Sequence, residues 1–277
     1  QKDFQKEIGK NNAKYFDKNG WLYFTKEMFD LLYPSYGDTY PTYLGSIGMT
    51  YEKAGGGVAG LGILNSENKV LTLVDRINHH TTSGISTVEI SSLNAKELNE
   101  NFKDFFNIRS NKNYILKGNT DKLQKLKRLL DAHEIHYSNA GNNKIYAYSY
   151  QSNKNESLQT YQSDLLISTN QPKGKLVDVL FEQNAKLSDS LTYDITSWSL
   201  PYAYGLDAYM TNKKILGGIN EDVISILNSF DENAIAYGLK WDHMNDAKFL
   251  SNILKNKIKV RYNKTEFTTN GIKYNPG

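Results

Sequence analysis

The sequence predicts an α/β fold in two domains, and three observations support this. Apolar residues recur at helical spacing in several segments, and short aromatic or β-branched runs lie between them. The 277 residues suffice for one large domain or two modest ones. A polar, aperiodic stretch at residues 107–113 separates the two halves. We therefore expect one domain over residues 1–108 and a second over residues 109–277.

The composition is that of a globular protein. Hydrophobic residues make up 39% of the chain and aromatic residues 12%, whereas disordered chains have few aromatics and a high net charge. The net charge of +3 is too small to indicate a nucleic-acid partner. A basic group has the spacing of the solvated face of a helix instead: Lys122, Lys125, Lys127 and Arg128. No apolar run approaches the roughly 20 residues of a membrane span.

The patterns of the first half predict helices and short strands. Residues 1–18 have Phe4, Ile8 and Tyr15 at near-helical spacing, which predicts an amphipathic helix. The other expected elements are an aromatic strand or turn at 20–24, a helix from Thr25 to Pro34, strands at 45–52 and 58–65, and a strand leading into long helices over 69–106.

The patterns of the second half predict βαβ units. A strand at 114–117, a helix at about 120–132 and a strand at 135–137 form the first. Residues 234–262 have a similar pattern, which weakly indicates a repeat. The other expected elements are a strand, turn and helix over 163–182, a helix broken at Pro201, and a hairpin over 267–277.

The residue types that bind metals give no zinc motif in this chain. The absence of cysteine excludes disulfides, thiolate metal sites and cysteine nucleophiles. His133 and His136 flank a predicted helix end, and the adjacent His79 and His80 point apart on either a helix or a strand. His243 is expected at the surface, at the start of a helix. We therefore expect no metal ligands here.

The glycine-rich segment GGGVAGLG contains the spacing G-x-G-x-x-G at Gly55, Gly57 and Gly60. A dinucleotide-binding loop needs a strand directly before this motif and a helix directly after it. Neither is predicted here, so the glycines do not indicate a nucleotide cofactor.

Glu52 is the candidate catalytic residue that the local pattern isolates. If residues 45–52 form a strand, the small residues Gly48 and Thr50 share the face of Glu52 and leave room for a ligand. A carboxylate in a partly desolvated cleft is suited to accept and then donate a proton. A structural carboxylate that binds backbone amides of the glycine-rich segment fits the same pattern. The spacing leaves both interpretations open.

Three segments resemble bacterial zinc carboxypeptidases of the M14 metallopeptidase family, in a large multi-domain branch. They are YPSYGDTYPTYLGSIGMTYEKAGGGVAGLGI, LTLVDRINHHTTSGISTVE and LSDSLTYDITSWSLPYAYGL. The resemblance spans most of the chain, is strongest over residues 20–95 and 187–206, and is weak from residue 234 on. It implies the C-terminal part of a mixed-sheet catalytic domain, followed by an α/β domain similar to class I glutamine amidotransferases.

The resemblance also implies roles for individual residues. Glu52 matches the catalytic glutamate, which takes a proton from a zinc-activated water and passes it to the leaving amine. Tyr33 is the best match, and Tyr36 a close second, to the tyrosine on the loop that closes over a peptide or protein substrate, and the resemblance does not decide between them. It further implies zinc in the parent protein and a periplasmic or extracellular location.

The family's zinc ligands have no match in this chain, because no H-x-x-E motif is present. Both ends of the sequence fall inside predicted elements, so we expect a fragment that lacks the N-terminal half of the catalytic domain and is inactive alone. The alternative is a non-catalytic binding module of a secreted or surface protein. An amidotransferase activity is disfavoured, because that chemistry normally needs a cysteine nucleophile.

Overall fold

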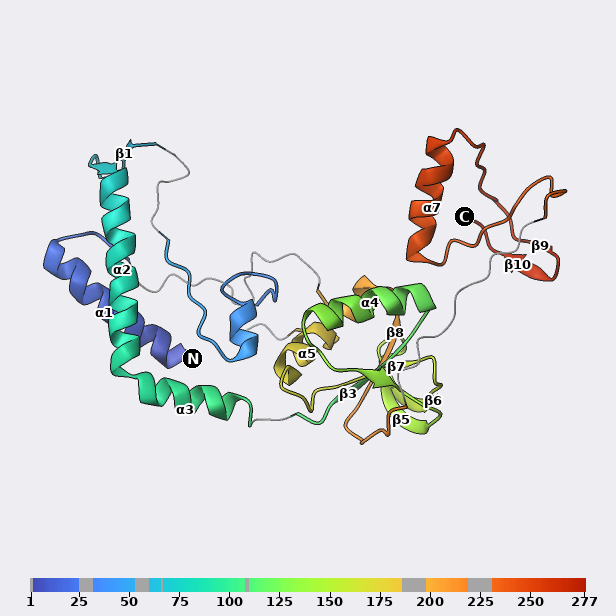
Figure 1. The fold of residues 1–277 in the computed structure, drawn as a ribbon, viewed down its shortest axis with the longest axis horizontal. Helices are drawn as coiled ribbons and strands as arrows, with labels where there is room; N and C mark the ends of the chain where they lie inside the picture. Colours follow the sequence, from blue (N-terminus) through green and yellow to red (C-terminus); the bar gives the residue numbers. More distant parts are fainter. Residues whose placement is uncertain are drawn as a thin grey trace. The chain divides into compact units, whose positions relative to one another are not determined.

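The structure is a computed structural model, and it describes residues 2–24, 32–52, 60–65, 67–107, 110–185, 198–218 and 231–277. The chain divides into two compact units. Unit 1 comprises residues 1–110, 172–180 and 184–198; unit 2 comprises residues 111–171, 181–183 and 199–277. The described residues contain seven α-helices and a six-stranded antiparallel sheet, so the mixed α/β class is confirmed (Figure 1).

Unit 1 is built mainly from helices. Its elements are α1 (Lys2–Asn19), the 3₁₀ helix η1 (Tyr40–Leu44), β1 (Gly62–Leu64), β2 (Val70–Thr72), α2 (Leu73–Leu93), α3 (Ala95–Phe105) and all but the last residue of α5 (Gly174–Phe181). β1 and β2 form a short antiparallel hairpin. The predicted first helix and the strand that leads into long helices are confirmed.

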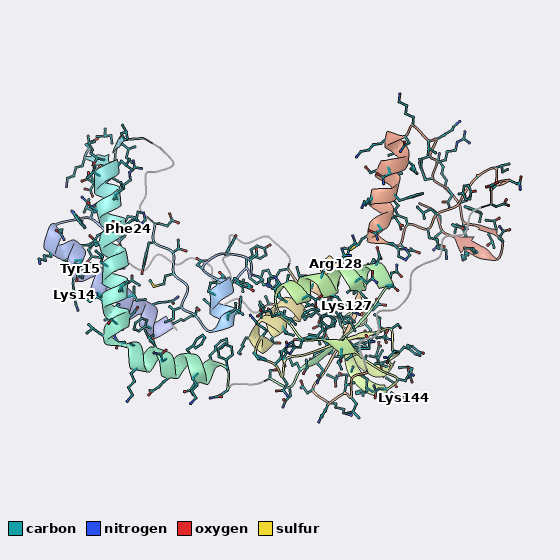
Figure 2. All side chains as sticks on the ribbon, in the orientation of Figure 1. Lys14, Tyr15, Phe24, Lys127, Arg128 and Lys144 are labelled. Atoms are coloured by element: carbon teal, nitrogen blue, oxygen red, sulfur yellow. The ribbon has the colours of Figure 1, made fainter. Side chains whose placement is uncertain are left out.

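Helices α1 and α2 pack together and are joined by polar contacts (Figure 2). Asn11 is buried and donates to the backbone oxygen of Ser86 at 3.0 Å and to the carboxylate of Glu89 at 2.8 Å. A capping box starts α2: the Asp75 amide donates to the Thr72 hydroxyl, and the Asp75 carboxylate accepts from the Thr72 amide. These contacts align the longest helix of the described chain.

The predicted strand at residues 45–52 is wrong, because residues 46–52 have no regular secondary structure. Gln5 donates from its side-chain amide to the backbone oxygen of Gly48 at 2.7 Å, and the same glycine lies against the backbone of Asp38. The segment is therefore held by contacts with distant residues rather than by a strand partner. Of the predicted helix from Thr25 to Pro34 only residues 32–34 are described, and they are not helical. The glycines at 55 and 57 lie outside the described residues.

Unit 2 contains the larger sheet. Its elements are β3 (Asn113–Lys117), α4 (Thr120–Ala132), β4 (Ser138–Asn139), β5 (Lys144–Ser149), β6 (Lys154–Gln159), β7 (Leu165–Ser168), α6 (Leu200–Ala203), β8 (Asp207–Thr211), α7 (Met244–Lys255), β9 (Phe267–Thr269) and β10 (Ile272–Tyr274). The strand order of the large sheet is β4-β7-β3-β8-β5-β6, and every neighbouring pair is antiparallel.

This order is that of a split βαβ arrangement. β3 and β4, which flank α4 in sequence, both run antiparallel to β7 between them and are therefore parallel to each other. β7 and β8 both run antiparallel to β3, which lies between them, and are therefore also parallel to each other. The β5–β6 hairpin extends the sheet beyond β8. The predicted βαβ connection exists, but its two strands are not neighbours.

Three boundaries in unit 2 differ from the prediction. Glu134 has a positive φ of 55°, and the Ile135 amide donates to the Leu130 oxygen at 2.9 Å, so residues 133–135 close α4 and β4 starts later. Helix α6 begins at Leu200 and holds Pro201 in its first turn instead of breaking there, because a first-turn proline loses no helical hydrogen bond. In residues 234–262 only α7 forms, and Tyr237 is exposed in irregular backbone, so the predicted repeat is wrong.

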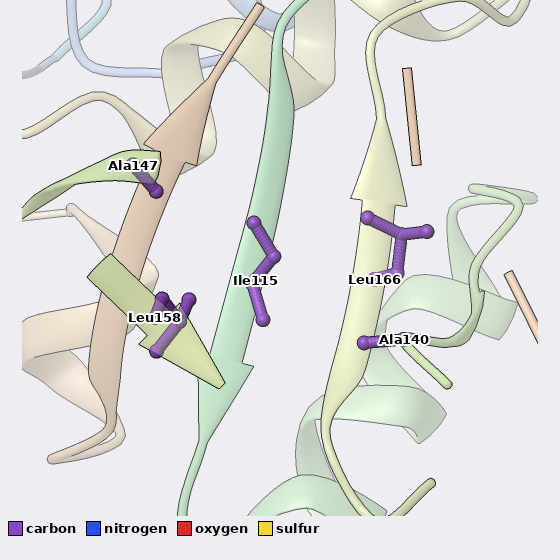
Figure 3. Close-up of a cluster of buried hydrophobic side chains, with 5 residues drawn as sticks. All are labelled: Ile115, Ala140, Ala147, Leu158 and Leu166. Carbon is purple, nitrogen blue, oxygen red and sulfur yellow. The ribbon is translucent and has the colours of Figure 1, made fainter. Parts of the chain in front are cut away.

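The core of unit 2 lies on the sheet. Five buried apolar side chains from five segments of the chain form one cluster, shown in Figure 3: Ile115, Ala140, Ala147, Leu158 and Leu166. Helix α4 buries Leu123, Leu126 and Leu130, which recur at intervals of three and four residues. The apolar periodicity of the sequence thus corresponds to burial in this unit.

Candidate functional site

A depression of about 870 Å³ in unit 1 brings together two segments of the candidate site. Its lining consists of Tyr36, Gly37, Asp38, Pro41, Ile47, Gly48, Met49, Thr50, Tyr51 and Glu52. The lining mixes aromatic, aliphatic and carboxylate side chains, as small-molecule and peptide sites commonly do. The depression is thus formed by the two halves of the segment in which the sequence pattern isolated Glu52.

The first segment is a series of turns that leads into η1. The Tyr36 amide donates to the Tyr33 oxygen at 3.3 Å, and the Tyr40 amide donates to the Tyr36 oxygen at 2.9 Å. The rings of Tyr33 and Tyr36 meet edge to face, with centroids 5.1 Å apart. Gly45 ends η1 with a φ of 91°, a conformation that disfavours other residues. These contacts fix the backbone on either side of Tyr36.

The second segment approaches the first at Gly48. A Cβ atom on Gly48 would lie 1.6 Å from the backbone oxygen of Asp38, so only glycine fits this position. The Thr50 hydroxyl donates to the Asp38 carboxylate, and the Tyr51 hydroxyl is hydrogen-bonded to Thr87 on α2. The residues that precede Glu52 are therefore held on both sides.

The charged groups of the lining are both acidic. Asp38 is half-buried and engaged by Thr50, whereas the side chain of Glu52 is exposed. No described lining residue carries a positive charge. The exposed side chain of Glu52 does not lie in the partly desolvated setting that the sequence predicted. Its carboxylate can still accept a proton from a bound molecule and return it. Glu52 is thus the lining acid best placed to act on a ligand.

The three predicted site residues do not all lie in the depression. Glu52 and Tyr36 both line the depression, whereas Tyr33 does not line it and instead supports the ring of Tyr36. The predicted separation of residues 47–52 onto two faces is wrong, because all six line the depression. Sequence reasoning missed Asp38, although its position in a Gly-Asp turn between tyrosines was visible.

The described residues do not form a zinc site. Nowhere in the part of the chain that the structure describes do three or more histidine, aspartate or glutamate side chains gather as metal ligands would. His79 is buried with its ring 4.2 Å from that of Trp21, while the neighbouring His80 is exposed, so the pair points apart as predicted. The residues present therefore do not fit the zinc that the resemblance implies.

Two further findings are not confined to the depression. Among the described residues, no helix has the length and apolar character needed to cross a membrane. None of the family models, curated proteins or solved structures compared with this chain matches it.

Proposed function

We propose that this chain is the proton-transferring portion of a zinc metallocarboxypeptidase that hydrolyses peptide bonds. The single observation that supports the proposal is the depression of unit 1, because Glu52 and Tyr36 line it together. These are two of the three residues to which the family resemblance assigns roles.

The proposed role of Glu52 follows from its place in the lining of the depression. Its carboxylate accepts a proton from the attacking water and then donates that proton to the leaving amine of the cleaved peptide. The hydroxyl of Tyr36 donates a hydrogen bond to the substrate and helps to exclude water. Tyr33 is assigned to holding Tyr36, since it contacts that ring and does not line the depression.

The zinc of the proposed enzyme belongs to another part of the parent protein, since the described residues offer no ligand set. We propose that this part is the missing N-terminal half of the catalytic domain and that the chain alone does not hydrolyse peptides. The periplasmic or extracellular location and the peptide or protein substrate belong to the same proposal. They rest on the family resemblance.

The exposed face of α2 supports a partner for unit 1. Val74, Ile77, Ile85 and Val88, here called the α2 stripe, lie on one side of the helix, and each is more than half exposed. Apolar side chains exposed along one face of a helix favour a protein interaction site there. The missing half of the catalytic domain would cover it.

The proposal is tested by Glu52→Gln in the complete parent protein. Loss of general acid–base catalysis is expected to lower kcat by about 10²- to 10⁴-fold, while the bound zinc measured by metal analysis stays unchanged. Glu97→Gln on α3 is the matched control, because Glu97 is an exposed glutamate that does not line the depression. Undiminished turnover in Glu52→Gln would overturn the assignment.

A non-catalytic binding module is the second candidate function, and the α2 stripe favours it equally. In that case the depression holds a ligand without transforming it, and Glu52 contributes a hydrogen bond or charge to recognition. Zinc analysis of the parent protein separates the two functions. A complete protein that purifies without zinc and cleaves no peptide would favour the binding module.

The amidotransferase-like character of the second half stays a prediction. The described strands of its large sheet pair only in antiparallel fashion, and the sequence has no cysteine for the usual nucleophile. We therefore assign no separate activity to unit 2.

A further inference from the structure

Trp198 contacts the tyrosine pair of the candidate site from a distant part of the sequence. Its ring centroid lies 5.9 Å from that of Tyr33 at an interplanar angle of 56°. Tyr33 in turn meets Tyr36 edge to face, and Tyr36 lines the depression. All three residues belong to unit 1, although more than 160 positions separate Trp198 from the tyrosines. A continuous series of aromatic contacts thus reaches the depression.

Trp198 is itself held in place. Its indole Nε1–H donates to the backbone oxygen of Val179 on α5 at 3.1 Å. Val179 and its helical neighbours Leu176, Val177 and Leu180 are buried. The indole is therefore anchored on one side by a buried helix and presents its ring to Tyr33 on the other.

We propose that Trp198 is a positioning residue for Tyr36 and acts through Tyr33. A tyrosine on a series of turns gains a fixed orientation only when its ring packs against something rigid, and the indole anchored on α5 supplies that surface. The second half of the chain would thereby set the geometry of a site formed by the first half. This inference rests on the proposed function for its catalytic consequence, but the aromatic contacts stand without it.

The first test measures amide hydrogen exchange in the full 277-residue chain. Trp198→Ala is expected to raise the exchange rates of the Tyr36 and Tyr40 amides by about 2- to 10-fold, the range that corresponds to one aromatic pair. Both amides are hydrogen-bonded within this turn segment. Trp198→Phe keeps an aromatic ring and is expected to retain most of the protection.

Two controls separate positioning from unfolding. Trp241→Ala is the matched substitution, because Trp241 is 59% exposed and belongs to unit 2, so it should leave the two amides unchanged. The Val177 amide, bonded to the Lys173 oxygen at 2.9 Å, reports on α5 and should stay protected in Trp198→Ala. Unchanged exchange at Tyr36 and Tyr40 in Trp198→Ala would overturn the proposal, as would equal loss of protection in Trp198→Phe.

The second test uses the zinc-loaded parent protein and peptide substrates. Trp198→Ala is expected to raise KM by about 2- to 10-fold with a smaller change in kcat, because Tyr36 would bind the substrate in a less fixed orientation. Trp198→Phe should restore most of the KM. If exchange responds as expected but the parent protein has no peptidase activity, the proposed function fails while the positioning role of Trp198 stands. A normal KM in an active Trp198→Ala enzyme would contradict that role.

Discussion

The two units differ in where they place their apolar residues. Among the described residues of 2–107, Ile8, Phe16 and Ile63 are the only buried apolar side chains besides Pro34, whereas residues 111–171 bury fourteen hydrophobic ones. Unit 2 therefore has a core, and its sheet and α4 can stabilise each other. The first part of unit 1 carries the candidate site, but it has few buried apolar groups.

This difference indicates that the first part of unit 1 and the sheet of unit 2 rely on different forces. Burial of apolar area supplies most of the free energy of folding, at about 25 cal/mol per Å². The first part of unit 1 depends more on polar contacts such as those of Asn11, and a single hydrogen bond contributes only about 1 kcal/mol net. Unit 1 would accordingly gain stability if a partner covered the α2 stripe, as the proposed function requires.

The largest expected effect tests this contrast directly. Leu126 on α4 is fully buried, so Leu126→Ala should lower the free energy of unfolding of unit 2 by about 2–5 kcal/mol through lost burial and a residual cavity. The matched change Val88→Ala removes an exposed side chain of the α2 stripe and should stay within about 0.5 kcal/mol. Urea titration followed by amide exchange in β3 and α2 measures both.

A loss of several kcal/mol from Val88→Ala in the 277-residue chain would contradict the comparison, since it would mean that the α2 stripe is already covered. The same substitution in the parent protein gives a more decisive test of the α2 stripe. There the proposed N-terminal half buries Val88, and a loss of more than about 1 kcal/mol is expected.

The elements that the sequence predicted correctly are those with strong local patterns. Helix α4 has leucines at helical spacing. The Thr72–Asp75 capping box that starts α2 is an equally local pattern, although it was not among the predictions. Both patterns act within a few residues, so one sequence reveals them. The strand order of unit 2 depends instead on pairings between distant segments, which periodicity does not encode.

The candidate site was predictable only in part for the same reason. The family resemblance indicated Glu52, with Tyr33 and Tyr36 as alternatives, and the depression favours Tyr36 for ligand contact. The irregular path of residues 46–52 depends on Gln5 and Asp38, both remote in sequence. The contact from Trp198 is more distant still and leaves no local signal.

An intermediate effect is expected from Gly48→Ala. The added Cβ would overlap the backbone oxygen of Asp38, so the two segments of the depression must separate, at a cost of about 1–3 kcal/mol. Gly84→Ala is the matched control in the same unit, because nothing lies within 4 Å of a Cβ at that helical position. It should instead stabilise α2 by about 0.5–1 kcal/mol.

Amide exchange of residues 36–45 and of α2 distinguishes the two glycine substitutions. Gly48→Ala should increase exchange near the depression and Gly84→Ala should decrease it in α2. If Gly48→Ala leaves the exchange of residues 36–45 unchanged, the close approach of the two segments does not define the site.

The smallest expected effect is a pH dependence confined to unit 1. Hydrogen bonds donated by Asn11 and Tyr15 lower the pKa of the Glu89 carboxyl from its ordinary value of 4.5. A carboxyl whose pKa is lower in the folded state stabilises the fold above its unfolded pKa, and this contribution is lost as the pH falls through the folded pKa. The contact between α1 and α2 should therefore weaken as the pH falls below about 4.5.

Amide exchange of α1 between pH 6 and pH 3, corrected for intrinsic rates, measures this loss. Glu89→Gln removes the titrating group and should flatten the pH dependence of α1, while the exposed Glu97→Gln should leave it unchanged. The amide protection of β3 in unit 2 should be unaffected by the Glu89 substitution, because Glu89 belongs to unit 1. Equal pH dependence of α1 in the wild-type chain and in Glu89→Gln would show that the buried Asn11 joins the two helices without help from the charge on Glu89.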